Sequence, residues 1–173
     1  MDLYRADKRT LKKMQDDFPR GFEAWVPLTA AQARKFVSLC LGSSDTDGLP
    51  LNLVSQYKDK NNFRQLGDFS TFIKYNKDQS TVWISTAINT ECGGQSGGAT
   101  RYKFTFALNE FSVVNKKLVP LVGGRKSALK PTLLLDGAGI ADSNFIAINH
   151  GPLDDAEVSF LTTIPLDKIT GTL

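Results

Sequence analysis

Cysteine and histidine are scarce in this sequence, which limits the thiol and metal chemistry that it can support. Two cysteines and one histidine occur in 173 residues. Cys40 and Cys92 are too few for a disulfide framework and lie in no pattern with zinc-ligand spacing, so we expect no metal site. Cys40 falls on the apolar face of a predicted helix, whereas Cys92 lies in a glycine-rich segment. A cysteine hydrolase built from Cys92 and His150 stays an alternative, provided that the two side chains meet in the fold.

Long hydrophobic runs and clusters of one charge are also missing. No apolar stretch approaches the roughly 18 residues that a membrane-spanning helix needs, and the residues after Met1 contain no hydrophobic segment of a signal peptide. The formal net charge is only +3, and the basic residues are scattered among acidic ones. We therefore expect neither a nucleic acid nor a membrane as a partner.

Helical patterns are confined to the N-terminal third. The clearest helix is predicted over Ala30–Leu41, where Thr29 and Gln32 form a capping-box pattern at its start. Weaker helical spacing is found over Leu11–Phe18 and after Pro50. These segments predict short helices before the first strongly β-prone run.

Short β-prone runs fill the chain from Thr81 onward. Arg101–Leu108 alternates apolar and polar residues, as a half-buried strand does. Further short apolar runs, separated by glycine and proline, lie at Phe111–Val114, Leu118–Val122, Leu133–Leu135 and Phe145–Ile148. The expected fold class is therefore α+β, a single domain over residues 1–173 with N-terminal helices packed on mainly antiparallel β-sheets.

The segment Asp154–Leu161 is a predicted strand with an unusual pair of acids. Alternation assigns Ala156, Val158 and Phe160 to the core face and Asp155, Glu157 and Ser159 to the unpacked face. Two carboxylates so close repel each other and raise one pKa, an arrangement typical of carboxylates that take part in catalysis. The alternative is an ordinary solvated strand face.

Three separated segments follow one another in a recognisable order. An arginine lies in Leu3–Asp7, a serine-threonine pair lies on the predicted strand Ile84–Ala87, and a glutamate begins Glu157–Ser159. Pro19–Gly21 and Ile164–Gly171 flank the first and last of them. Together these segments resemble the mono-ADP-ribosyltransferase toxins of the cholera and heat-labile enterotoxin type and, more distantly, the pertussis-like toxins.

The resemblance implies a fold, an activity and a setting. The fold would be an ADP-ribosyltransferase-like catalytic domain, and the activity would be transfer of ADP-ribose from NAD to a side chain of a host protein. Such a protein is a bacterial toxin or effector that is secreted or injected and acts in the host cytoplasm. The resemblance also admits a delivery or binding subunit as a partner.

The resemblance also implies a set of residues around NAD. Arg5 would hold the phosphate and ribose next to nicotinamide through charge-assisted hydrogen bonds, and Arg20 would contact a second phosphate. The neighbours of Arg5 on the same segment, Tyr4, Ala6 and Asp7, would line the NAD site. We expect the guanidinium of Arg5, the hydroxyl of Ser85 and the carboxylate of Glu157 to meet at one cleft.

Glu157 would be the catalytic carboxylate, because loss of nicotinamide passes through an oxocarbenium-like species whose positive charge a fixed carboxylate stabilises. Ser85, with Thr86 beside it, would support the nicotinamide ribose and orient Glu157. Asp155 would meet the acceptor group and take its proton. Asp155 stands where arginine-modifying members have glutamate, so NAD glycohydrolase is an alternative activity, and a binding module without catalysis is a further one.

Overall fold

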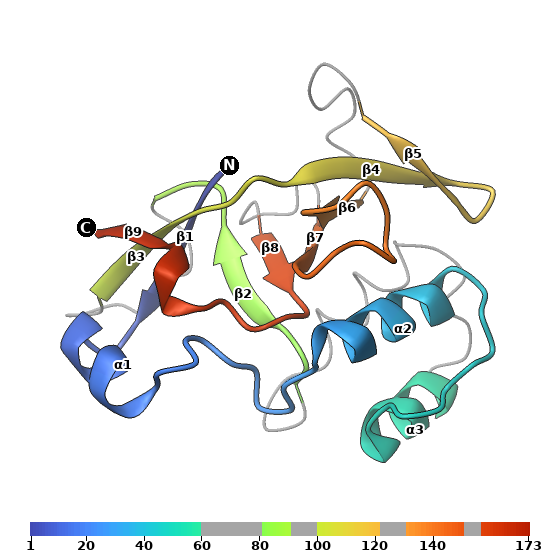
Figure 1. The fold of residues 1–173 in the computed structure, drawn as a ribbon, viewed down its shortest axis with the longest axis horizontal. Coiled ribbons are helices and arrows are strands. Elements are labelled where there is room, and N and C mark those ends of the chain that lie inside the picture. Colours follow the sequence, from blue (N-terminus) through green and yellow to red (C-terminus); the bar gives the residue numbers. More distant parts are fainter. Residues whose placement is uncertain (60–80, 91–99, 122–130, 151–156) are drawn as a thin grey trace.

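The computed structural model describes residues 1–59, 81–90, 100–121, 131–150 and 157–173 (Figure 1). The helices are α1 (Leu11–Asp17), α2 (Ala30–Cys40) and α3 (Leu51–Asp59), with a 3-10 turn, η1, at Leu166–Lys168. The strands are β1 (Asp2–Asp7), β2 (Ile84–Ala87), β3 (Thr100–Thr105), β4 (Asn109–Val114), β5 (Lys117–Pro120), β6 (Thr132–Leu135), β7 (Ile146–Asn149), β8 (Glu157–Phe160) and β9 (Ile169–Thr172).

The described strands form one nine-stranded sheet in the order β5-β4-β6-β7-β8-β2-β1-β3-β9. Every neighbouring pair in this order is antiparallel. Figure 1 shows α1 near the β1, β3 and β9 end of the sheet and α2 with α3 near the other end. In the sheet order only β2 lies between β1, at the start of the chain, and β8, near its end.

This architecture is mainly β, so the predicted α+β class was wrong, and so was the expected ADP-ribosyltransferase-like fold with N-terminal helices packed on sheets. The three described helices contain only 7, 11 and 9 residues. The N-terminal third also supplies β1, and the extended chain between α1 and α2 makes bridges from Phe22 to Ile164 and from Leu28 to Thr162. Local helical spacing overstated the helical share because strand pairing joins residues that are distant in sequence.

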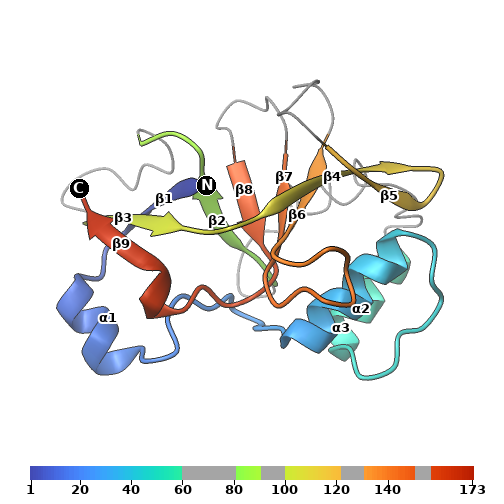
Figure 2. The same ribbon diagram turned by 45° about the horizontal axis from the view of Figure 1, so that its top comes forward.

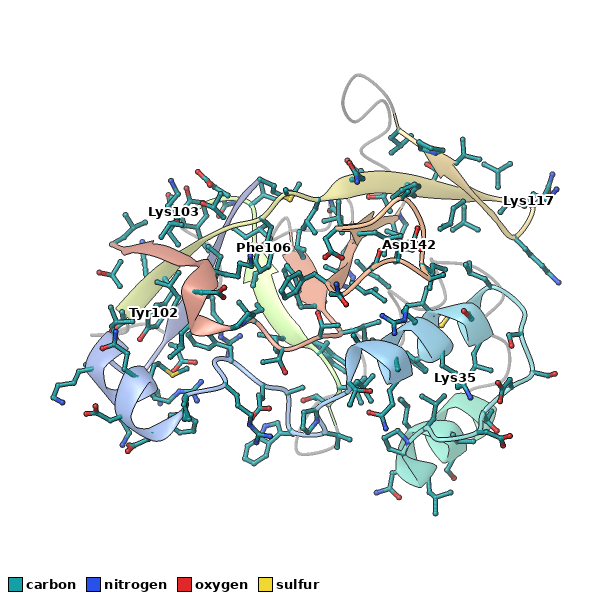
Figure 3. The ribbon with its side chains drawn as sticks, viewed as in Figure 1. Lys35, Tyr102, Lys103, Phe106, Lys117 and Asp142 are labelled. Atoms are coloured by element: carbon teal, nitrogen blue, oxygen red, sulfur yellow. The ribbon has the colours of Figure 1, made fainter. Side chains whose placement is uncertain are left out.

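Two hydrophobic clusters cover the two faces of the central strands. Leu133 and Leu135 pack with α2 and α3, whereas Leu134 between them belongs to the second cluster. This alternation is what a strand buried on both faces requires. The second cluster also holds Tyr102 and Phe106, both labelled in Figure 3, together with Met14 of α1 and Leu3 of β1.

Local signals at α2 agree with the sequence analysis. Thr29 accepts a hydrogen bond from the backbone N–H of Gln32, and Gln32 Oε1 accepts one from Thr29 N, so the predicted capping box is confirmed. The buried side of α2 includes Phe36 and the predicted buried cysteine, Cys40. No helix in the described ranges is long and apolar enough to cross a membrane.

Both chain ends are fixed to the β3 region. The N-terminal ammonium donates to the carbonyl of Phe106 at 2.7 Å, and Leu173 N–H donates to the carbonyl of Arg101 at 2.8 Å. Figure 2 shows both ends in the part of the sheet formed by β1, β3 and β9. This attachment holds β1 in place, and β1 carries Arg5.

Candidate active site

Three neighbouring strands bring Arg5, Ser85 and Glu157 together. Arg5 lies on β1, Ser85 on β2 and Glu157 at the start of β8. Arg5 Nη1 donates to the carbonyl of Ser85 at 2.8 Å, and Ser85 Oγ donates to Glu157 Oε1 at 2.7 Å. The antiparallel registers of β1 with β2 and of β2 with β8 produce this contact between residues that are 72 and 80 positions apart.

Two hydroxyl groups hold one oxygen of the Glu157 carboxylate. Besides Ser85, Ser159 Oγ donates to Oε1 at 2.9 Å. Among the described residues, no donor reaches the other oxygen, Oε2. Glu157 is half-buried, and these two hydroxyl groups fix its carboxylate through one oxygen.

Arg5 is a partly buried guanidinium with unused donor capacity. Its side chain is 24% exposed, and its Nη2 lies 3.5 Å from Asp7 Oδ2. Burial lowers the pKa of Arg5, while the charge of Asp7 opposes that change. Within the part of the chain that the structure describes, its Nε–H has no hydrogen-bond acceptor. A buried donor without an acceptor is costly unless a ligand supplies one.

Asp7 joins Arg5 to a second arginine, Arg9. The Asp7 carboxylate accepts from Arg9 Nε at 2.8 Å, from Arg9 Nη2 at 2.7 Å and from the Arg9 backbone N–H at 3.0 Å. Burial acts to raise the pKa of Asp7, but the hydrogen bonds and charges of the two arginines outweigh it, so the pKa lies below its ordinary value. Its hydrogen bond with Asp7 raises the pKa of Arg9.

Arg9 was missed in the sequence analysis. Strand alternation gave no signal for it, because β1 ends at Asp7 and Arg9 lies in the bend that follows, where Asp7 Oδ1 accepts a hydrogen bond from the Arg9 backbone N–H. The guanidinium of Arg9 also lies over two aromatic rings, 4.5 Å from the centre of Phe18 and 5.5 Å from that of Phe22.

A cleft of about 550 Å³ lies beside these groups, a size typical of small-molecule sites. Its lining includes both guanidinium groups and Ser85, and aromatic surface comes from Phe18, Trp25 and Trp83. Trp25 is 68% exposed. Glu157 is not among the residues that line this cleft, but its carboxylate accepts a hydrogen bond from Ser85, which does line it.

Other predicted site residues have different surroundings. Arg20 is 78% exposed, pairs with Glu23 at 3.1 Å and lies outside the described lining of the cleft. Tyr4 is half-buried and Ala6 is buried, both within β1. Thr86 Oγ1 donates to the carbonyl of Val158 at 2.7 Å, so this buried hydroxyl ties β2 to β8.

The sequence predicted an unpacked face on β8 that includes Glu157 and Ser159, but the structure covers this face at Ser159. Ser159 is fully buried, and its Oγ lies 3.0 Å from Nε2 of the buried His150. The expectation failed because this face of the sheet is packed: Ile148, the partner of Ser159 on β7, and Leu161 belong to the hydrophobic cluster that includes α2. Asp155, the second acid of the predicted pair, lies outside the described residues. So does Cys92, and with it the alternative pair of Cys92 and His150.

No group of three or more potential ligand side chains for a metal ion occurs in the described ranges. The chain matches no model of a protein family and no curated protein, so the interpretation of the site depends on its geometry and on the residues themselves.

Proposed function

We propose that the chain is an NAD-dependent mono-ADP-ribosyltransferase. The observation that carries the proposal is the hydrogen-bonded series from Arg5 through Ser85 to Glu157, built from three distant parts of the chain beside a cleft. The proposal depends on this site and not on the overall fold, which is mainly β.

The charges of the cleft suit the diphosphate of NAD. Arg5 and Arg9 present two guanidinium groups to it, and a guanidinium can bind a phosphate through two parallel hydrogen bonds. Asp7 holds both groups, so little side-chain freedom would be lost on binding. The aromatic surface of Trp25 and Trp83 would accept a planar base by stacking.

Glu157 would act on the bond between nicotinamide and ribose. As this bond breaks, its electron pair stays with the ring nitrogen, nicotinamide leaves as a neutral molecule, and positive charge develops on the ribose. The carboxylate of Glu157 stabilises that charge, and the hydroxyl of Ser85 keeps the carboxylate in place. The acceptor side chain then bonds to the ribose carbon, and Asp155 takes the proton that it releases.

The setting follows from the resemblance to bacterial toxins. The acceptor would be a host protein, and the chain would be secreted or injected and act in the host cytoplasm, with a delivery subunit as a further partner.

The first experiment incubates the protein with host-cell lysate and NAD labelled in its adenylate part. We expect labelled protein and free nicotinamide. The Glu157→Gln variant should lose about 100-fold to 1,000-fold in rate, as is typical when one group that stabilises transition-state charge is removed. Glu110→Gln, the same change on β4, is the control and should keep full activity. Absence of both products with the wild-type protein would refute the proposal.

Asp155→Ala separates transfer from hydrolysis. We expect this variant to keep release of nicotinamide and to lose labelling of protein, because the acid is assigned to the acceptor and not to NAD. If the wild-type protein released only free ADP-ribose and labelled no protein, the activity would be NAD hydrolysis. If calorimetry showed NAD binding without turnover, the chain would be a binding module.

A further inference from the structure

Ser159 and His150 form a second hydrogen-bonded series that ends on the catalytic carboxylate. Ser159 Oγ donates to Glu157 Oε1 at 2.9 Å and lies 3.0 Å from His150 Nε2. Ser159 has no exposed surface, and His150 is only 4% exposed. Since Ser159 is closed off from solvent, water is not available to replace either contact.

The directions of these hydrogen bonds can be assigned. The single proton of the Ser159 hydroxyl is used in donating to Glu157, so its oxygen is an acceptor toward His150. His150 must therefore carry its proton on Nε2 and donate it to Ser159. Burial lowers the pKa of His150, although the Glu157 charge opposes this, so the neutral ring is favoured.

The backbone fixes the ring relative to the carboxylate. His150 N–H donates to the carbonyl of Glu157 at 3.0 Å, directly after the pairing of Asn149 with Val158 between β7 and β8. His150 and Glu157 are therefore held side by side by their main chains as well as through Ser159.

We infer that His150 is a positioning residue for the reaction, which acts through the hydroxyl of Ser159 to hold Glu157 Oε1. The inference rests on the proposed function, because it assigns a role at the same site. The two series arrive from opposite neighbours of β8, Ser85 from β2 and His150 from the end of β7. Because the hydroxyl groups of Ser85 and Ser159 both hold Oε1, the orientation of the carboxylate, and with it the direction of Oε2 toward the substrate, is fixed. Pre-organised groups of this kind act on the transition state more than on substrate binding.

The test compares two variants at position 150. His150→Gln keeps an N–H donor near the position of Nε2, whereas His150→Asn is too short to reach Ser159. For His150→Asn we expect kcat for nicotinamide release to fall about tenfold to a hundredfold, with KM for NAD within about twofold of the wild type. A Ser159 hydroxyl released by His150 no longer holds the Glu157 carboxylate, so a hydrogen bond to a charged group is lost as well. His150→Gln should recover most of kcat.

Ser159→Ala is the second arm and should match His150→Asn in kcat, while the double variant should lose no more than either single variant. Additive losses in the double variant, or equal losses in the Gln and Asn variants, would overturn the inference. The inference would also be overturned if Ser159→Ala kept both the kcat and the melting temperature of the wild-type protein. These outcomes differ from failure of the proposed function itself, which would appear as no nicotinamide release by the wild-type protein and would remove this role as well.

Discussion

Replacing Asp7 by asparagine should destabilise the protein, because this one carboxylate pairs with both arginines of the cleft. Asp7 is 6% exposed and accepts three hydrogen bonds from Arg9, with Arg5 3.5 Å away. Asparagine keeps one acceptor oxygen but removes the charge and turns an N–H group toward donors. Breaking a fully buried ion pair costs about 3–5 kcal/mol. The arginine side chains are 24% and 27% exposed, so water compensates in part and we expect about 2–3 kcal/mol.

The pH dependence of this difference is a sharper test. The pKa of Asp7 lies below its ordinary value of 3.8, so its stabilisation is present above that value and is lost as the pH falls through the lower, folded pKa. Urea unfolding of wild-type and Asp7→Asn proteins should therefore differ at pH 7 and converge toward the acid limit.

Asp16→Asn is the matched control, because Asp16 pairs with Lys12 across side chains that are 55% and 83% exposed. That change should cost less than about 0.5 kcal/mol. Equal stability of the Asp7→Asn and wild-type proteins at pH 7 would refute the assigned role of Asp7, and so would a difference that persisted undiminished at the lowest pH.

Two further predictions concern the first strand and the turn after α1. Arg5→Lys should weaken NAD binding about tenfold in calorimetry, since an ammonium cannot make a two-pronged contact with phosphate, and an unchanged Kd would remove Arg5 from the site. Gly21→Ala should cost about 3 kcal/mol or more in urea unfolding, because φ is +99° and an added Cβ would lie 2.1 Å from the carbonyl oxygen of Ile164, which pairs with Phe22. Gly139→Ala is its control, with no atom within 4 Å of the added Cβ, and equal losses in the two variants would contradict the explanation.

Local features of the fold were predictable from the sequence. The capping box at Thr29 and Gln32 was found because its partners are three residues apart. The alternation over Arg101–Leu108 identified β3, whose Tyr102 and Phe104 are fully buried. Both signals lie within one element, where spacing alone carries the information.

The fold class was not predictable in the same way. The helical spacing of Leu11–Phe18 is real, but it produces a helix of only 7 residues, and the extended chain that follows pairs with Ile164 and Thr162. Which strands join a sheet depends on pairings between residues far apart in the chain, such as Tyr4 with Ala87 and Ala87 with Glu157, and no local pattern encodes them.

The candidate site shows the same division. Arg5, Ser85 and Glu157 were identified from residue type and order, and the structure brings them together. The series from His150 through Ser159 was not foreseen, because alternation assigned Ser159 to an unpacked face, whereas that face is packed by the cluster that includes α2 and Ser159 is fully buried. When both faces of a strand are buried, alternation along its sequence no longer tells which side chains are exposed to solvent.

A crystal structure of the Glu157→Gln protein with NAD shows whether the cleft is the NAD site. We expect the diphosphate against Arg5 and Arg9 in the cleft and the nicotinamide ribose next to Ser85 and residue 157. An empty cleft at saturating NAD, or NAD bound at a different surface, would contradict this expectation.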